Sequence, residues 1–438
     1  MQCGKKSFIL TDIHTEDKSN SAGGEVTVSE QLREDAERII YAAIEAAMPE
    51  QAVKNALGVC TFGPGKTVLI AVGKAAWTMA ESAYRVLGGN IFSGAVITKY
   101  GHSKGPIGPL EIYEAGHPVP DENSFVAAER VVNIVSGLSE KDTVLFLISG
   151  GGSALFEIPL ISWDRIQKLT NELLRCGADI KEINTVRKHL SAVKGGRFAD
   201  ICSPAKVLSV ILSDVLGDPL DMIASGPAYP DSTTSEQALS ILRKYGLSVS
   251  EEILSALKKE TPKSLSNVEA YVSGSVRQLC DSAEKTAASL GYTPIILTDS
   301  LCCTARDAGV FLSNIAQKYS GCGKSMAFIC GGETVVKLTG SGCGGRNQEL
   351  ALAAAEGISG MDNVAVFSVG SDGTDGPTDA AGGYVDGKTK SRLDDLEIDI
   401  HCVLAQNDSY YALEKTGGLI ITGPTGTNVN DLSVLLIR

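Results

Sequence analysis

Glycine and charged residues stand directly after apolar runs in this sequence, and the first such group holds a lysine. The string Ala71-Val72-Gly73-Lys74 joins the apolar run Thr67–Val72 to a helical pattern that starts near Ala75. The free N–H groups and the dipole of a helix N-terminus attract anions. A lysine there adds a mobile positive charge that suits phosphate. Because helix starts prefer acidic residues, Lys74 predicts an anion site, with a solvated surface lysine as the alternative.

A glycine-rich loop follows the second apolar run, Thr143–Ile148. Three successive glycines let backbone N–H groups turn inward around an anion, with serine hydroxyls beside them. The loop is not a Walker A motif, because no Gly-Lys-Ser/Thr closes it, and it lacks the GxGxxG fingerprint. A plain strand-to-helix turn is the alternative, but it needs fewer glycines. We predict that the loop binds phosphate or substrate through Ser149, Gly150, Gly151, Gly152 and Ser153.

Two further basic groups occur in an otherwise acidic chain. Residues 184–197 hold several cations on differing helix faces, so about half of them would be surface charges. Arg346 opens the apolar run Leu350–Glu356, and its guanidinium can clamp a carboxylate or phosphate through two hydrogen bonds. From position we assign a substrate- or phosphate-binding role to Arg187, Lys194, Glu333 and Asn347.

Carboxylates follow two of the apolar runs. Asp214 and Asp218 come after Lys206–Leu212, and Asp372 comes after Val364–Val369. Mg²⁺ binds through one or two carboxylates together with phosphates, and a carboxylate can also accept the proton of a substrate hydroxyl. Asp-Gly turn chemistry is the alternative for any single one of them. We assign Asp214 to catalysis and Asp218 and Asp372 to a metal.

The elements that position these residues alternate between strand-like and helical runs. Continuous Val/Ile/Leu runs suit parallel strands buried on both faces, and the alternation predicts an α/β fold. Ligands of such sheets bind beyond the carboxyl ends of the strands, where the unusual residues stand. We expect helices over Ser29–Leu57 and Ala75–Leu87, and further strands at Ala270–Ser273, Pro294–Thr298, Ser325–Cys330, Val335–Leu338, Val364–Val369 and Leu419–Thr422.

Length and composition give the domain count and exclude several classes of protein. A chain of 438 residues exceeds the ~250–300 at which a single core stops growing, so two domains are expected. The net charge of −13 argues against nucleic acid and anionic lipid as partners, and no run approaches the ~20 apolar residues of a membrane span. The 11 cysteines lack metal-site spacing and suit reduced thiols. We expect a cytoplasmic protein, and a homodimer is possible.

Several long strings, taken together, resemble the type II glycerate kinase family, whose C-terminal module is called MOFRL. The similarity covers almost the whole chain beyond an N-terminal extension. The strings are AVGKAAWTMA from Ala71, SGGGSAL from Ser149, INTVRKHLSAVKGGRFA from Ile183, LSDVLGDPLDMIASGP from Leu212, GGETVVKLTG from Gly331, GGRNQELALA from Gly344, GSDGTDGPTDAAGG from Gly370 and TGPTGTNVNDL from Thr422.

This resemblance implies an activity and two catalytic residues. The family phosphorylates D-glycerate at its 2-hydroxyl with ATP and Mg²⁺, and its catalytic lysine and arginine match Lys74 and Arg346. The sequence departs from the family at Thr304, where relatives carry a glutamate.

The resemblance also implies an architecture. It consists of a flexible extension (1–24), an N-terminal Rossmann-like domain with a mainly parallel sheet and helices on both faces (25–255), and a second α/β domain (268–438). The second domain contains the MOFRL module at about 325–432, and the active site is expected in the cleft between the domains.

Two other functions compete with the kinase. Hydroxypyruvate reductase would need a GxGxxG turn with an acidic residue ~20 positions later, which the sequence does not supply. A non-catalytic sugar-acid-binding protein would have little use for Asp-rich loops beside two cations suited to phosphate.

Overall fold

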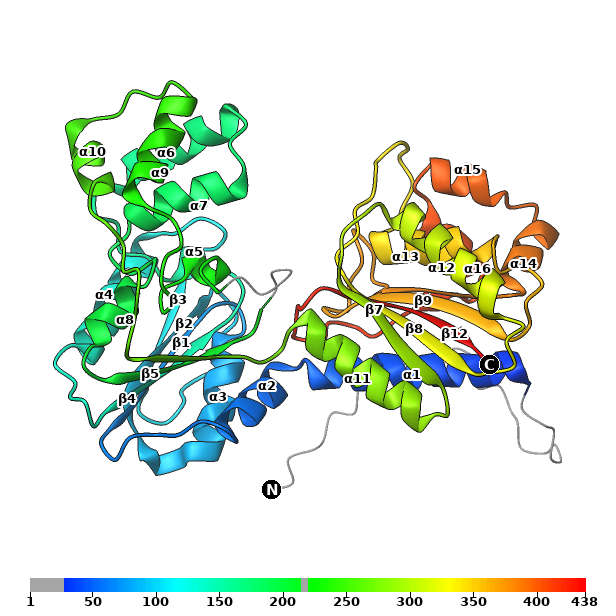
Figure 1. Cartoon of the computed structure of the whole chain (residues 1–438), viewed down its shortest axis with the longest axis horizontal. Coiled ribbons are helices and arrows are strands. Elements are labelled where there is room, and N and C mark those ends of the chain that lie inside the picture. Colours follow the sequence, from blue (N-terminus) through cyan, green and yellow to red (C-terminus); the bar gives the residue numbers. More distant parts are fainter. Residues whose placement is uncertain (1–26, 214–219) are drawn as a thin grey trace. The chain divides into compact units, whose positions relative to one another are not determined.

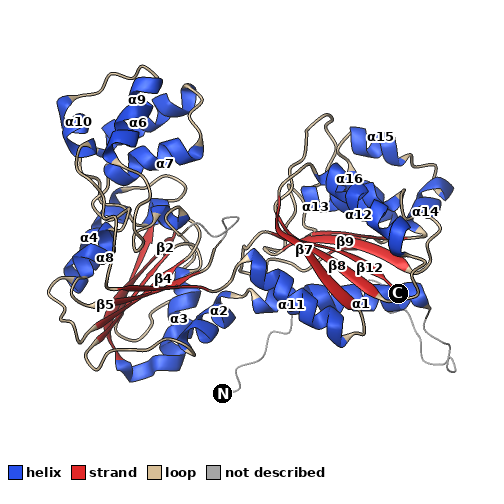
Figure 2. Ribbon diagram, in the orientation of Figure 1, coloured by secondary structure: helices blue, strands red, loops and turns tan. Residues whose placement is uncertain are grey.

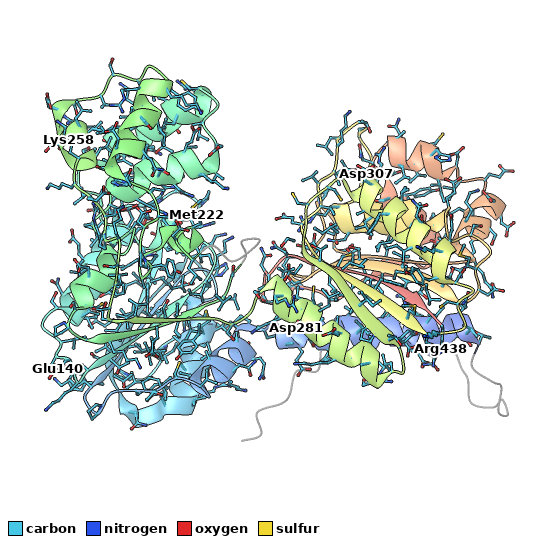
Figure 3. All side chains as sticks on the ribbon, viewed as in Figure 1. Glu140, Met222, Lys258, Asp281, Asp307 and Arg438 are labelled. Carbon is cyan, nitrogen blue, oxygen red and sulfur yellow. The ribbon has the colours of Figure 1, made fainter. Side chains whose placement is uncertain are left out.

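The computed structural model describes residues 27–213 and 220–438, and the chain divides into two compact units (Figure 1). The first unit comprises residues 49–274, and the second combines the helix before residue 49 with residues 275–438. Each unit is built around a six-stranded sheet with helices packed against it (Figure 2). Side chains fill the space between each sheet and its helices (Figure 3). The predicted two-part α/β architecture is confirmed.

The sheet of the first unit is entirely parallel. Its strand order is β3-β2-β1-β4-β5-β6, the doubly wound order in which the direction of winding reverses between β1 and β4. Every residue of β1 and β4 is buried, as their unbroken apolar runs predict. The strands are β1 (Thr67–Val72), β2 (Ile91–Lys99), β3 (Leu110–Ala115), β4 (Thr143–Ile148), β5 (Lys206–Ile211) and β6 (Val268–Val272).

Helices cover both faces of this parallel sheet. On one face lie α2 (Pro49–Leu57) and α3 (Ala76–Leu87), and on the other lie α4 (Glu122–Val135) and α8 (Arg197–Cys202) (Figure 1). The short α5 (Gly152–Leu155) follows β4. A helical cluster with its own apolar core is formed by α6 (Trp163–Arg175), α7 (Ile180–His189), α9 (Ser235–Lys244) and α10 (Glu251–Leu257).

The sheet of the second unit is mixed, with four antiparallel pairings and one parallel pairing. Its order is β11-β10-β9-β12-β8-β7. One face is covered by α1 and α11 and the other by α12 to α16 (Figure 1). The strands are β7 (Thr293–Leu301), β8 (Met326–Gly332), β9 (Val364–Gly370), β10 (Gly382–Asp386), β11 (Leu419–Ile420) and β12 (Asp431–Ile437). The helices are α1 (Val28–Ala46), α11 (Val276–Ser289), α12 (Ala305–Tyr319), α13 (Arg346–Ala355), α14 (Thr389–Asp395), α15 (Ile400–Ala405) and α16 (Ser409–Thr416).

The predicted helix over Ser29–Leu57 is two helices, because Pro49 lacks an N–H and suits a first helical turn. The cap of α1 is Thr27, which forms a capping box with Glu30. Helix α1 packs on α11 and β9 and so belongs to the second unit. The units therefore divide at residues 48/49 and 274/275, whereas the sequence placed the N-terminal domain at 25–255.

Most of the predicted strands are confirmed, including the partly exposed strands β6 and β7, but two of the predictions fail. Val335–Leu338 is not a strand: only Val335 pairs, in an isolated bridge with Thr304, and Leu338 is exposed. The run Leu419–Thr422 is a strand only over Leu419–Ile420. The strands β2, β3, β10 and β12 were not predicted. For two of them the reason is the lack of a continuous apolar run: β3 is a half-exposed edge strand, and β10 starts with two glycines.

Candidate active site

The turn after β1 and the glycine-rich loop after β4 lie side by side, because β1 and β4 are paired strands. The backbone N–H of Lys74 donates to the carbonyl of Gly150 at 2.9 Å. The buried Ser149 hydroxyl donates to the Val72 carbonyl at 3.3 Å and accepts from the Ala75 N–H at 3.1 Å. A side chain at position 73 would overlap Ser149, so only glycine fits there. The predicted ligand Ser149 thus joins the two strand ends.

Backbone amides of the loop are open to an anion. The Gly152 and Ala154 amides donate within the loop, to Ser149 and Gly151. The amides of Gly150, Gly151 and Ser153 have no acceptor in the part of the chain that the structure describes. Gly151 has φ +86°, which turns the chain here without a Cβ penalty. This geometry supports the predicted anion nest at the switch point of the parallel sheet.

The side chain of Lys74 is exposed beside this nest and, among the described residues, forms no ion pair. A Cβ on Gly151 would lie 3.2 Å from Lys74 Cγ and 3.0 Å from the His117 ring, so both side chains approach the same glycine. Burial and the charges of Lys74, Lys99 and His102 lower the pKa of His117. Within the described structure Lys74 is therefore a cation without a partner, in a positive environment that suits phosphate.

Lys194 does not lie in the open part of this site. It is fully buried beneath the loop, where its ammonium contacts the Glu157 carboxylate and donates to the Ser153 carbonyl at 2.7 Å. Burial lowers the pKa of Lys194 to about 8, although Glu157 acts in the opposite direction. The Ser153 hydroxyl lies 3.0 Å from the Ser225 hydroxyl. Lys194 thus holds the loop from behind, because its charge is already used by Glu157.

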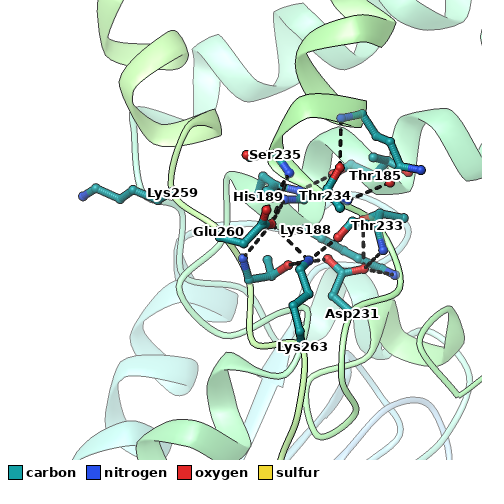
Figure 4. A network of polar contacts seen from close by, with 12 residues as sticks. Thr185, Lys188, His189, Asp231, Thr233, Thr234, Ser235, Lys259, Glu260 and Lys263 are labelled. Atoms are coloured by element: carbon teal, nitrogen blue, oxygen red, sulfur yellow. Dashed lines mark hydrogen bonds and ion pairs between the residues drawn. The ribbon is translucent and has the colours of Figure 1, made fainter.

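The cations of the basic segment around Arg187 fall into two groups, those with partners and one without any among the residues described; Figure 4 shows the network that contains Lys188 and His189. The buried Lys188 pairs with Asp231 at 3.1 Å and with Asp221 at 3.3 Å. The buried ring of His189 contacts Glu260 at 3.2 Å. Arg197 donates to backbone carbonyls at 188, 189, 191 and 259. Half-buried Arg187 has no such partner within the described residues, so it is the cation of this segment that an anion can use.

In the second unit, Arg346 is the first residue of α13 and is held by a carboxylate. Its Nε and Nη2 donate to the two oxygens of Asp431 at 2.5 and 2.9 Å, and its Nη1 lies 3.6 Å from Glu333. Burial alone would lower the pKa of Arg346, but the Asp431 carboxylate outweighs burial and raises it. The guanidinium is therefore permanently charged and fixed in direction, with about a third of the side chain exposed.

The N-terminus of α13 is occupied by Asp375. Its carboxylate accepts from the amides of Asn347 and Gln348 at 3.2 and 2.8 Å. Burial raises the pKa of Asp375 to about 6. The side chain of Asn347, predicted to bind substrate, is buried and bonded to Asp375 and Ser368. Asn347 consequently supports the helix start that presents Arg346.

Of the acidic residues predicted to bind metal or act in catalysis, the structure describes only Asp372. Asp372 is half-buried, and one of its oxygens accepts from the Thr374 amide at 2.9 Å, as in an Asx turn. Asp214 and Asp218 lie outside the described residues. Over 27–213 and 220–438, no three His, Cys, Asp or Glu side chains gather as a metal site.

Comparison with known proteins decides the family. The model described as a domain of unknown function (DUF4147) matches residues 35–258, and the MOFRL family model matches residues 326–431. A D-glycerate 2-kinase from Thermotoga maritima is 56% identical, over 93% of this chain and 99% of that protein. The chain belongs to the glycerate kinase family.

Other relatives match a similar share of this chain, but not all of them are named as kinases. A glycerate 2-kinase from Pyrococcus horikoshii is 41% identical, over 94% of this chain and 98% of that protein. A protein from Agrobacterium vitis, named as a hydroxypyruvate reductase, is 39% identical over 91% of this chain and 93% of its own. The crystal structure of a Thermotoga maritima glycerate kinase superposes with a TM-score of 0.90 at 55% identity, over 93% of this chain and 100% of that chain.

The contacts of three carboxylates in this glycerate kinase family member were not predicted from the sequence. Asp431 and Asp375 lie in strings already quoted for the resemblance, but nothing in their spacing shows that they contact α13. Glu157 follows the glycine-rich loop, and its burial depends on tertiary packing. Thr304, which departs from the family pattern, caps α12: its hydroxyl accepts from the Asp307 amide at 3.2 Å.

Proposed function

We propose that this chain transfers the γ-phosphoryl group of ATP to the 2-hydroxyl of D-glycerate and forms 2-phospho-D-glycerate. The hydroxyl oxygen bonds to the γ-phosphorus, the bond from that phosphorus to the β–γ bridging oxygen breaks, and ADP and the hydroxyl proton are released. The observation that carries the proposal is the exposed Lys74 beside three backbone amides at the switch point of a parallel sheet, none of which has a partner among the residues that the structure describes. The kinase names of the relatives support the same activity.

Each component of the site has a role in this reaction. The amides of Gly150, Gly151 and Ser153 would bind phosphate oxygens, and Lys74 would neutralise the charge that moves with the γ-phosphoryl group. Arg346, which Asp431 holds in one direction, would supply a second fixed positive charge. Arg187 would bind a substrate anion. Such a reaction depends on positioning and charge neutralisation more than on covalent catalysis by the protein.

Mg²⁺ is expected with ATP, and Asp372 suits it in part. One carboxylate oxygen of Asp372 is not used by the Asx turn, and Mg²⁺ needs only one or two carboxylates when phosphates supply the other ligands. The ion would neutralise charge on the phosphates. Asp218 as a second metal ligand and Asp214 as a catalytic residue remain predictions.

Asp372→Asn tests the metal assignment. We expect turnover to fall about 10²-fold and to recover partly as the Mg²⁺ concentration is raised, because size is kept while charge is lost. Asp395→Asn, at an exposed position of α14, is the control. Wild-type kinetics at every Mg²⁺ concentration would assign Asp372 to its turn alone.

The hydroxypyruvate reductase alternative rests on the names of relatives and on the strand order, which dinucleotide-binding sheets share. The turn after β1 nevertheless lacks GxGxxG. ADP and NAD(P)⁺ formation should be measured with D-glycerate, L-glycerate and hydroxypyruvate, with and without NAD(P)H and EDTA. We expect ADP with D-glycerate, none in EDTA, and no oxidation of NAD(P)H. Full turnover in EDTA, or NADH oxidation at a comparable rate, would contradict the proposal.

No helix in the described ranges has the length and apolar character needed to cross a bilayer. We propose a cytoplasmic enzyme with reduced thiols that acts on small molecules, and sedimentation velocity would decide between monomer and homodimer.

A further inference from the structure

His117 stands two residues after the end of β3 and lies against the glycine-rich loop. The Cβ position of Gly151 is 3.0 Å from His117 Cδ2 and 3.1 Å from Nε2, so the ring covers the face of that glycine. The same Cβ position is 3.2 Å from Lys74 Cγ. Neither ring nitrogen has a hydrogen-bond partner in the described parts of the chain. A half-exposed imidazole therefore lies beside both the open amides and the free cation of the proposed phosphate site.

The groups whose charge acts on this ring within the described residues come from three elements. Lys74 from the turn after β1 and Lys99 from the end of β2 are cations, and His102 lies in the turn that follows β2. The nearby carboxylate, Asp121, is occupied by the Tyr100 hydroxyl at 2.7 Å and by the Ser124 amide at 3.1 Å. Burial and these neighbours lower the pKa of His117, which favours the neutral form of its ring.

His102 shows by contrast why His117 is available. The Nδ1 atom of His102 lies 3.2 Å from the Lys74 carbonyl oxygen, so that ring supports the backbone of the turn. His117 has no such role in the described structure. A neutral imidazole can accept a proton, whereas the ammonium groups of Lys74 and Lys99 can only donate.

We propose that His117 accepts the proton of the acceptor hydroxyl during phosphoryl transfer. As the 2-hydroxyl oxygen of D-glycerate bonds to the γ-phosphorus, its O–H bond breaks and the proton passes to an unprotonated ring nitrogen. ADP leaves, and the imidazolium loses the proton to solvent, to which the ring is partly exposed. The surrounding cations favour that loss and restore the neutral ring. The inference rests on the proposed kinase function and names a base for it.

This assignment competes with Asp214, the residue that the sequence analysis placed in catalysis. The two bases predict different pH dependence. Turnover controlled by His117 falls as pH drops through a pKa somewhat below the ordinary histidine value. A carboxylate base in its usual range would keep turnover constant to about pH 5.

The test compares His117→Gln, His117→Ala and Asp214→Asn with wild type. His401→Gln is the control, since His401 is an exposed histidine of α15 in the second unit. The measurements are kcat for D-glycerate from pH 5 to 9, the KM for ATP, and the melting temperature. Glutamine keeps a hydrogen-bond donor but cannot accept the proton. We expect kcat of His117→Gln to fall about 10²-fold or more, with the KM for ATP and the melting temperature little changed.

Two further results are expected if His117 is the base. The acid limb of the wild-type pH profile should be absent from His117→Gln, and free imidazole should restore part of the turnover of His117→Ala. Wild-type kcat in His117→Gln would overturn the proposal, as would an acid limb that persists in His117→Gln and disappears in Asp214→Asn. If wild type itself forms no phosphoglycerate, the proposed function fails and not this assignment alone.

Discussion

The two cations assigned to catalysis are held in opposite ways. Lys74 stands on a turn whose shape is fixed by backbone hydrogen bonds and by the Ser149 hydroxyl, and its ammonium is exposed and unpaired in the described structure. Arg346 is fixed through its side chain, by two hydrogen bonds that it donates to Asp431, on a helix whose first amides donate to Asp375. The parallel sheet supplies an open nest, and the mixed sheet supplies a pre-oriented charge.

The difference predicts how each site responds to change. A lysine on a flexible stem can follow a moving phosphoryl group, whereas a guanidinium clamped by a carboxylate moves less and loses less side-chain entropy on binding. Removing Lys74 should cost activity alone. Disturbing Arg346 should also cost stability, because buried carboxylates are left behind.

The largest expected effect is that of Lys74→Ala. Turnover should fall about 10³-fold, in the range found when a charge-stabilising group is removed, while the melting temperature stays at the wild-type value. Steady-state ADP formation and thermal unfolding check this, with exposed Lys54 on α2 changed to Ala as the control. A parallel loss of stability would show that Lys74 is structural and break the contrast.

The next largest effect is that of Asp431→Asn, which removes the negative charge that pairs with Arg346 but keeps the size of the side chain. Turnover should fall about 10²-fold, and the free energy of unfolding should decrease by about 2 kcal/mol. This decrease is smaller than for a fully buried ion pair, because Arg346 is partly exposed. Arg346→Lys should not restore turnover, since an ammonium cannot form the two parallel bonds. Denaturant unfolding and kcat measure both effects, and unchanged kinetics in Asp431→Asn would mean that Arg346 needs no orientation.

A smaller effect concerns Asp375, whose pKa burial raises to about 6 from an ordinary value of 3.8. The folded protein therefore binds more protons than the unfolded chain between about pH 4 and 6, and stability falls as pH rises through that window. Asp375→Asn should remove this contribution. Subtracting the unfolding free energy of the variant from that of wild type isolates the contribution, and a difference that does not vary from pH 4 to 6 would contradict the raised pKa.

The smallest effect is expected from replacing the buried pair under the loop, as in Lys194→Met with Glu157→Leu. A buried ion pair exchanged for apolar residues of similar volume often leaves stability unchanged. Loss of the bond to the Ser153 carbonyl should loosen the nest and raise the KM for ATP less than tenfold, because the open amides remain. The single variant Lys194→Met should be much less stable, since it leaves Glu157 buried and unpaired. Equal stability of both variants would show that Glu157 is not charged.

Whether a feature of the fold or the site could be predicted from the sequence depends on how far apart along the chain the residues that form it lie. The strands β1 and β4, the Lys74 turn and the nest are set by contiguous residues, so apolar runs and glycines identify them. The partners of Arg346 and Lys194 lie 85 and 37 residues away along the chain, and no local pattern connects them. Lys194 and Asn347 were assigned to substrate because residue type cannot distinguish a buried polar group from an exposed one.

The measurement that tests the account most directly is the turnover of wild type, Lys74→Ala, Arg346→Ala and the double variant, with formation of 2-phospho-D-glycerate followed by ³¹P NMR. If both cations stabilise charge in one phosphoryl-transfer step, each single variant should lose several orders of magnitude in turnover. The double variant should then be scarcely slower than the slower single one, because residues that act as a unit are not additive. Losses that multiply in the double variant, or wild-type turnover in either single variant, would contradict a shared step.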